Sequence, residues 1–266
     1  MGKRISLNLP LYKQMGGCCG LSSFLMLINP ERNAQLRTFL NDFYENIKFL
    51  KTTQIDEFKW SVVVDYLILK SIFDQELNNH IRSKDPDIVD YYFPIKLYEL
   101  KKYAFSRNGL LSKDVFTYHL HKWKTNYDLK ILFYLFGGTY YSQPQKFPDG
   151  TGSLYFETNS NSEAKAKLDE MKTHLKMSND NESFCIALNI RSFHWVAVNS
   201  ILDDNCILIN DPNGGQIKLK VDRISSQNRF YLFSYDLRES IILNSKILNR
   251  PWYHLNKFIC SDTLFF

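Results

Sequence analysis

The chain has 266 residues, of which 44% are apolar and 15% are aromatic. These fractions exclude an intrinsically disordered protein, and a chain of this length buries a core without disulfides or a structural metal. Basic residues number 33 and acidic residues 28, which gives a net charge of +5. This excess is small and forms no compact Lys/Arg block, so nucleic acid is not an expected partner.

The sequence indicates a reducing compartment without membrane association. No apolar run reaches the ~18 residues that a transmembrane helix needs. Residues 5–9 alternate between apolar and polar side chains, unlike the continuous apolar core of a signal peptide. The five cysteines are scattered and form no C-x-x-C pair. We therefore expect free thiols and a cytoplasmic protein.

The N-terminal part of the chain predicts a short strand, a loop and a buried helix. Residues 5–9 alternate as in a strand, and residues 11–20 contain three glycines, as in a turn or loop. Residues 21–28 are apolar except for two serines, which favours a buried helix that ends before Pro30. The glycine-containing loop therefore meets the start of a helix.

The middle of the chain is predicted to be mostly helical. Apolar side chains recur at helical spacing at Leu36, Leu40, Phe43 and Ile47, and again at Val62, Tyr66, Leu69, Ile72 and Phe73. Two further helices are expected over 87–105, with a disturbance at Pro94, and over 113–135. Residues 139–162 are typical of an irregular loop, and residues 163–177 of a polar helix with one solvated side.

A change of pattern at residue 182 predicts an antiparallel sheet. Its strands are expected at 184–188, 195–198, 206–209, 216–221 and 230–235. The segment Asp-Pro-Asn-Gly-Gly at 211–215 is a strong turn signal between the third and fourth strands. We expect a meander, in which each strand pairs with the next.

The predicted fold is α+β, with one domain over residues 1–266. The helix after the glycine-containing loop packs on the antiparallel sheet of residues 182–236. Residues 31–180 form a large, mostly helical insertion within the domain. The tail at 239–266 ends in Leu-Phe-Phe and is expected to dock on the body.

Cys19 has the sequence context of a catalytic nucleophile. The thiolate is the attacking species, and the positive end of a helix, where Cys19 is predicted to lie, favours the charged form of a thiol. Gln14 lies five residues upstream and could donate its side-chain N–H to a developing oxyanion, together with the backbone N–H of Cys19. Cys18 competes for the nucleophilic role, but the offset of one residue would aim its side chain elsewhere.

His194 and Asp211 are the candidates for the base and its orienting acid. His194 begins a predicted strand, so its ring can face a cleft while its neighbours are fixed in the sheet. A base that activates a thiol needs an acceptor on its second ring nitrogen. Asp211 ends a strand 17 residues later, and antiparallel pairing would bring the two side by side. Asn210 and Asp204 are reserve candidates for the acid, and Trp195 is expected to pack or to shield the His–Asp bond.

These residues also have structural interpretations. Cys19 could be a small buried hydrophobe, His194 a core histidine and Asp211 a cap of its turn. The histidines at 119 and 121 lie in a predicted helix, where positions two apart diverge. We therefore expect neither a metal site nor a cofactor.

The motifs resemble those of the papain-like cysteine peptidases, and within them the peptidase C39-like group. Gln14 followed by Cys-Gly-Leu at 19–21 resembles that group's opening motif. The segments 194–198 and 207–212 resemble its histidine and aspartate strands. This resemblance covers about a third of the chain. It implies a papain-like fold and four roles: nucleophile for Cys19, base for His194, orienting acid for Asp211 and oxyanion donor for Gln14.

The chain departs from that group in three respects. Cys19 and His194 are 175 residues apart, which is longer than expected and implies the helical insertion. Gln14 is one residue closer to Cys19 than in most papain-like enzymes. The chain also lacks the membrane span and ATPase motif of transporter-fused peptidases, so their double-glycine leader substrates are not expected here.

The resemblance implies a cysteine protease that hydrolyses a peptide or protein substrate. The sequence does not define its oligomeric state. Ubiquitin-like-modifier proteases share the His-Trp strand, but their glutamine and cysteine follow the histidine in the chain. Acyl transfer, as in transglutaminases or arylamine acetyltransferases, would use the same three side chains. A catalytically inactive binding module is the alternative from another class.

Overall fold

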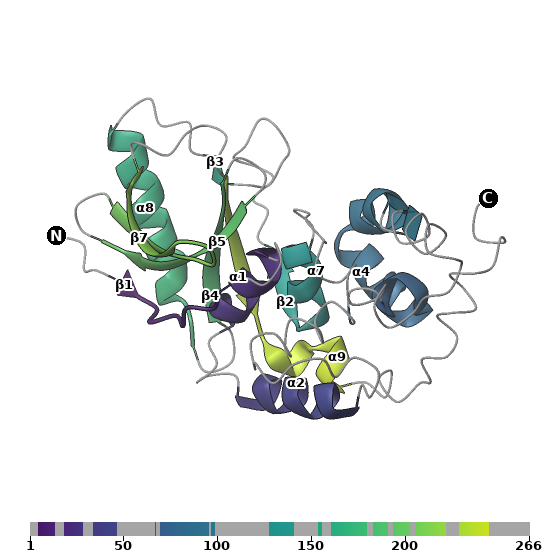
Figure 1. Ribbon diagram of the computed structural model, residues 1–266. Coiled ribbons are helices and arrows are strands. Elements are labelled where there is room, and N and C mark those ends of the chain that lie inside the picture. The colour runs from purple at the N-terminus through teal and green to yellow at the C-terminus, as the bar shows by residue number, and fades with distance from the viewer. Residues whose placement is uncertain are drawn as a thin grey trace.

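The computed structural model describes residues 5–13, 19–28, 34–46, 67, 70–95, 97–98, 128–140, 154–155, 161–179, 183–190, 194–202, 206–221 and 229–244. These residues form an α+β structure, in which helices pack on both faces of an antiparallel sheet (Figure 1). The α+β class and the packing of the helix that carries Cys19 on this sheet are confirmed. No helix of the described residues is long and apolar enough to cross a bilayer.

The sheet contains eight strands among the described residues. They are β1 (Ile5–Ser6), β2 (Gly138–Tyr140), β3 (Leu154–Tyr155), β4 (Ser183–Ile190), β5 (His194–Ile201), β6 (Cys206–Asp211), β7 (Gly215–Lys220) and β8 (Arg229–Tyr235). The order along the sheet is β2-β8-β4-β5-β6-β7, and β1 and β3 add to β5 and β8. All the recorded strand pairs are antiparallel.

The expected meander holds for β4 to β7 and is wrong for β8, which pairs with β4 instead of β7. Residues 184–189 of β4 are buried, so the backbone N–H and C=O groups along both edges of this strand need partners from neighbouring strands. β8 suits that central place because Phe230 and Phe233, on opposite faces, are both fully buried. By contrast β7 alternates between half-buried and exposed residues, as an edge strand does.

The irregular loop expected over 139–162 is wrong at its three described places, the last of which, residues 161–162, begins α8. Thr139 and Tyr140 belong to β2, and Leu154 and Tyr155 form β3, and both strands pair with β8. Strands of two or three residues carry too little alternation to be detected in a sequence. Long-range pairing with β8 creates them.

The helices are α1 (Cys19–Leu27), α2 (Ala34–Asn46), α4 (Gln75–Lys84), the π-helix η2 (Ile88–Tyr92), α7 (Asp128–Leu135), α8 (Asn161–Lys176), the 3-10 helix η4 (Leu237–Glu239) and α9 (Ile241–Asn244). The predicted polar helix corresponds to α8, and the first apolar stripe of the middle region lies in α2 as far as Phe43, whereas Ile47 lies outside the described residues. The predicted helix at 21–28 begins two residues earlier, so Cys19 is helical and not part of the loop.

The helix predicted over 87–105 is described only as far as Tyr98, and the expected disturbance near Pro94 is found. η2 widens the helix to a π-turn over the residues just before Pro94. Proline has no N–H to donate, and its ring clashes with the carbonyl four residues earlier, so a wider turn relieves both problems.

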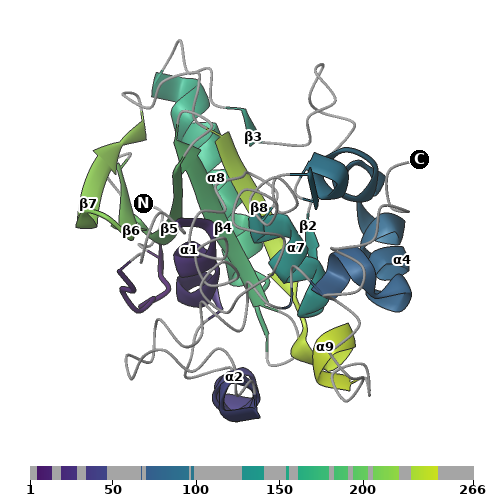
Figure 2. The same ribbon diagram turned by 45° about the vertical axis from the view of Figure 1, so that its right-hand side comes forward.

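Two apolar clusters hold the layers together. On one face, α1 and α7 pack on the sheet, and Phe133 stacks on Phe233 with ring centroids 4.1 Å apart. Phe24 of α1 meets Phe133 edge to face at 5.4 Å. On the other face, Met171 and Leu175 of α8 cover the strands (Figure 2). The helix that carries Cys19 is thus enclosed between the sheet and α7.

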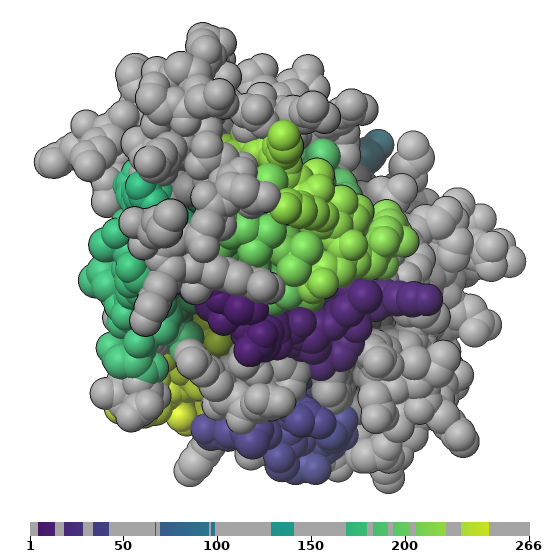
Figure 3. Space-filling view, turned by 90° about the vertical axis from the view of Figure 1, so that its left-hand side faces the viewer, coloured from purple at the N-terminus to yellow at the C-terminus, as the bar shows by residue number. Residues whose placement is uncertain are grey.

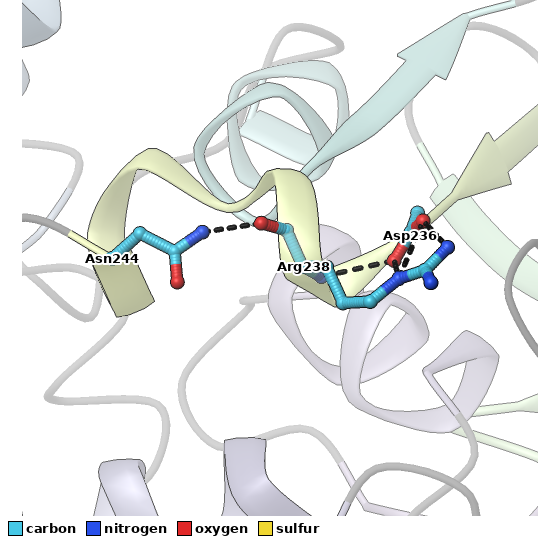
Figure 4. A network of polar contacts seen from close by, with 3 residues as sticks. All are labelled: Asp236, Arg238 and Asn244. Carbon is cyan, nitrogen blue, oxygen red and sulfur yellow. Dashed lines mark hydrogen bonds and ion pairs between the residues drawn. The ribbon is translucent and has the colours of Figure 1, made fainter.

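The chain after β8 turns back toward α7 through a polar network (Figure 4). Asp236 accepts the backbone N–H of Arg238 at 2.9 Å and pairs with its guanidinium, and Asn244 donates to the carbonyl of Arg238. Ser240, fully buried, donates to the carbonyl of Leu135 at 3.0 Å. This much of the expected docking tail lies against the body; residues 245–266 lie outside the described residues.

Candidate active site

Cys19 is the first residue of α1 and the only residue of that helix that is not fully buried. The eight residues after it are apolar, small or both, which suits a helix packed on several sides. Its sulfur accepts the backbone N–H of Trp195 at 3.5 Å. This place is the end of a helix that carries partial positive charge.

His194 begins β5 and is held by an acidic side chain from the next strand. Its Nε2 lies 2.8 Å from Oδ1 of Asp211, at the end of β6. The side chains are 22% and 13% exposed, so water reaches the pair only in part. In the antiparallel register Ala197 lies opposite Asn210, so Asp211, the next residue of β6, lies one position closer to His194. The expected meeting of His194 and Asp211 is therefore found.

Cys19 and His194 also meet. Their side-chain hydrogen bond is the largest influence that raises the pKa of His194 to about 9, the hydrogen bond and charge of Asp211 add to it, and burial opposes them. Because Nε2 is engaged by Asp211, Nδ1 is the ring nitrogen left for the sulfur. With this pKa the imidazole is protonated at neutral pH, and it loses its charge only as the pH rises through about 9.

Asp211 both orients the histidine and caps its turn. The same Oδ1 that meets His194 accepts the backbone N–H of Asn213 at 2.7 Å. The turn closes through Gly215, whose φ of 80° is left-handed, as in a three-residue hairpin loop. One carboxylate oxygen of this aspartate thus makes both the contact within the turn and the contact with His194.

The structure brings together three of the four predicted site residues, Cys19, His194 and Asp211. Gln14 and the competing Cys18 lie outside the described residues, as do Asp204 and the two histidines at 119 and 121. The reserve candidate Asn210 is not the acid. Its side chain points to the N-terminal segment, where it donates to the carbonyls of Leu9 and Pro10.

Two asparagines were missed as site-supporting residues. Asn199 and Asn210 are 5% and 1% exposed, and both bind the segment that leads to Cys19. A sequence signal existed, because each interrupts or ends a run of buried apolar strand residues. A polar side chain at such a place must find hydrogen-bond partners.

Trp195 packs beside the site, as expected. It is 1% exposed, and its ring meets Tyr231 at 4.8 Å in an edge-on arrangement. Its indole Nε1 is buried and has no hydrogen-bond partner among the described residues. The side chain belongs to the apolar cluster against which Cys19 packs, and the backbone N–H of Trp195 contacts the Cys19 sulfur.

The other described cysteines have the opposite environment. Cys185 and Cys206 are buried in the strands, and burial raises the pKa of the Cys185 thiol far above its usual range. A buried neutral thiol is a poor nucleophile. Among the described residues, Cys19 is thus the cysteine with a base beside it. In the same part of the chain, no three His, Cys, Asp or Glu side chains are grouped to hold a metal ion.

Comparison of the chain with profiles of known protein families, with curated proteins and with solved structures finds no match. The papain-like fold and the C39-like resemblance therefore stay predictions that depend on the site motifs alone.

Proposed function

We propose that the protein is a cysteine peptidase that hydrolyses peptide bonds in a peptide or protein substrate. The observation that carries this proposal is the line of contacts from Cys19 through His194 to Asp211, drawn from a helix start and two neighbouring strands. A nucleophile, a base and a group that orients the base are the minimum set for covalent acyl transfer. The motif order that resembles papain-like peptidases supports the same reaction.

In the proposed reaction, the Cys19 thiolate attacks the substrate carbonyl carbon, and its electron pair forms a carbon–sulfur bond. The protonated His194 donates its proton to the leaving amine as the peptide bond breaks. The neutral ring then takes a proton from water, whose oxygen attacks the thioester; the carbon–sulfur bond breaks, which frees the acid and restores the Cys19 thiolate and the protonated ring. Asp211 keeps the ring oriented throughout, since it is bonded to Nε2 at 2.8 Å.

The negative oxygen of the tetrahedral intermediate needs donors near the sulfur. The start of a helix directs backbone N–H groups outward, and such groups are the donors that stabilise an oxyanion. The resemblance adds the side-chain amide of Gln14 as the second donor. Under this proposal α1 and the sheet are the two sides of a papain-like cleft.

The decisive experiment is a peptide-library digest with the wild-type protein and Cys19→Ala. We expect cleavage by the wild type and its complete loss in Cys19→Ala. The matched control is Cys185→Ala, which removes a buried thiol from β4 and should retain cleavage within about twofold once its folding is verified. Cleavage that survives Cys19→Ala would remove the nucleophile from the proposal.

A second measurement separates hydrolysis from the alternatives that use the same residues. Added amine that competes with water for the acyl-enzyme would show acyl transfer as the main reaction. An inactive binding module would leave Cys19 no more reactive toward a thiol alkylator at mildly acidic pH than a free thiol. The peptidase proposal expects fast alkylation of Cys19 and release of free acid.

A further inference from the structure

The segment before the candidate nucleophile, residues 5–13, crosses from β5 past β6 to the start of β7. Figure 3 shows it in purple along the border of the green strands. It begins as β1, paired with the end of β5. Asn8 then adopts a left-handed backbone with a φ of 51°, which turns the chain toward β6; asparagine tolerates this conformation better than most residues. Leu11 reaches the start of β7, 3.9 Å from where a side chain at Gly215 would begin. The segment thus arrives beside the turn that holds Asp211.

Two buried asparagines hold this crossing. The Nδ2 atom of Asn210 donates to the carbonyl of Leu9 at 3.0 Å and to the carbonyl of Pro10 at 2.9 Å. An amide nitrogen has two hydrogens, so both are used. Oδ1 of Asn199 accepts the N–H of Leu9 at 2.8 Å, and Gln216 donates to Oδ1 of Asn210 at 3.2 Å. The amide of Asn210 is therefore fully engaged, and it is the donor to both carbonyls.

Asn210 and Asp211 are consecutive residues of β6 whose side chains contact different parts of the candidate site. Asp211 holds the His194 ring, and Asn210 holds the backbone that leads to Cys19. Successive side chains of a strand point to opposite faces, so one dipeptide can touch both halves of the site. The peptide bond between these two residues ties the position of the base to that of the nucleophile.

We propose that Asn210 is a positioning residue of the candidate active site, which places Cys19 against His194 by fixing residues 5–13 on the sheet. The inference deepens the proposed function and rests on it for the activity readout. A displacement of about 1 Å costs on the order of 10²-fold in rate when reacting groups are pre-aligned. Loss of the amide should therefore reduce the reactivity of Cys19 far more than a comparable loss elsewhere on the segment.

The test compares Asn210→Ala with Ser200→Ala. Ser200 is fully buried and donates its hydroxyl to Ser6 at 3.2 Å, so its loss loosens the same segment upstream of the crossing. Iodoacetamide is the probe, and peptide mapping assigns the label to Cys19. At pH 6 we expect the alkylation rate of Cys19 to fall about tenfold or more in Asn210→Ala and to stay within about twofold in Ser200→Ala.

Peptide cleavage provides the second readout. We expect kcat to fall on the order of 10²-fold in Asn210→Ala with KM within about threefold, because binding surfaces remain and alignment is lost. Asn210→Ser, which keeps one donor, should give intermediate values, and it carries the test if Asn210→Ala does not fold. The inference is overturned if folded Asn210→Ala or Asn210→Ser alkylates and cleaves like the wild type.

The two proposals fail in different ways. If Cys19→Ala still cleaves the substrate, the peptidase proposal fails, whereas the alkylation rates still decide the role of Asn210. If Cys19→Ala is inactive and the Asn210 variants are unimpaired, only the positioning role fails.

Discussion

Two aspartates at strand ends of this sheet make the same local contacts, yet only one belongs to the candidate active site. Asp211 ends β6 and Asp236 follows β8, and each accepts the backbone N–H two residues later, at 2.7 Å and 2.9 Å. Each also holds a basic side chain. The partner of Asp236 is Arg238 from its own turn, whereas the partner of Asp211 is His194 from another strand.

The two pairs differ in what the partner can do. Arg238 is 65% exposed, and its guanidinium holds the pKa of Asp236 below the usual range without changing any charge near neutral pH. His194 is 22% exposed, and its contacts with Cys19 and Asp211 change its charge at neutral pH. The local turn signature is therefore the same for a structural and a candidate catalytic aspartate. Only the long-range partner distinguishes them.

The largest expected difference between the two aspartates is in catalysis. Asp211→Ala should lower kcat/KM by on the order of 10²-fold or more, because the ring of His194 loses its orienting acceptor. Asp236→Ala should stay within about twofold in the same peptide-cleavage assay. Equal losses in the two variants would show that both aspartates act only through folding.

The next effect concerns the pH profile. The alkaline limb of kcat/KM should lie near the His194 pKa of about 9 in the wild type, because the protonated ring donates to the leaving group. Asp211→Asn removes a charge that raises this pKa, so the limb should move down by about 1 unit. NMR titration of the ring should show a larger decrease in Cys19→Ala, since the Cys19 contact is the largest cause of the shift. An unchanged titration in both variants would contradict the site geometry.

A third effect is the dependence of stability on pH. The pKa of His194 is raised in the folded state, so its contribution to stability is complete below the unfolded value near 6.5. That contribution is lost as the pH rises from there through about 9. Urea unfolding should show this decrease in the wild type and a weaker one in His194→Gln, whereas Asp236→Ala should keep the wild-type slope.

The smallest effects are expected at the Asp236 turn. Asp236→Ala removes the cap of η4 and should lower the free energy of unfolding by about 0.5–1 kcal/mol at any pH between 6 and 9. Arg238→Gln should lower the free energy of unfolding less than Asp236→Ala does. In about 1 M NaCl, Arg238→Gln and the wild type should be equally stable, because salt screens exposed charges. If Arg238→Gln lowers the free energy of unfolding equally at low and high salt, the Asp236–Arg238 pair is shielded from solvent like the His194–Asp211 pair, and this prediction is wrong.

Local patterns predicted much of this fold. The strands β4 to β7 and the helices α1, α2 and α8 follow from apolar runs, alternation and turn residues. The place of β8 beside β4 does not, because it depends on which strand must be buried on both faces, a property of the assembled sheet. The short strands β2 and β3 form only because they pair with β8.

The site was predictable to a similar extent. The order of motifs identified Cys19, His194 and Asp211 as neighbours, since helix starts and strand ends are where side chains meet across layers. The place of Asn210 at the end of an apolar run predicts that its side chain needs hydrogen-bond partners, but the sequence does not identify them, because an asparagine before a turn has the same context whether it caps the turn or binds a distant backbone. Its partners, Leu9 and Pro10, are about 200 residues away in the sequence.

The late return of β8 to the middle of the sheet has a consequence for synthesis. When residues 183–220 have left the ribosome, the hairpins that carry His194 and Asp211 are complete, but the second edge of β4 has no partner until residue 235 follows. A nascent chain paused in that interval exposes an apolar strand edge, which invites association with other chains. Slow codons or truncation between residues 221 and 235 should therefore reduce the yield of soluble protein more than the same changes elsewhere.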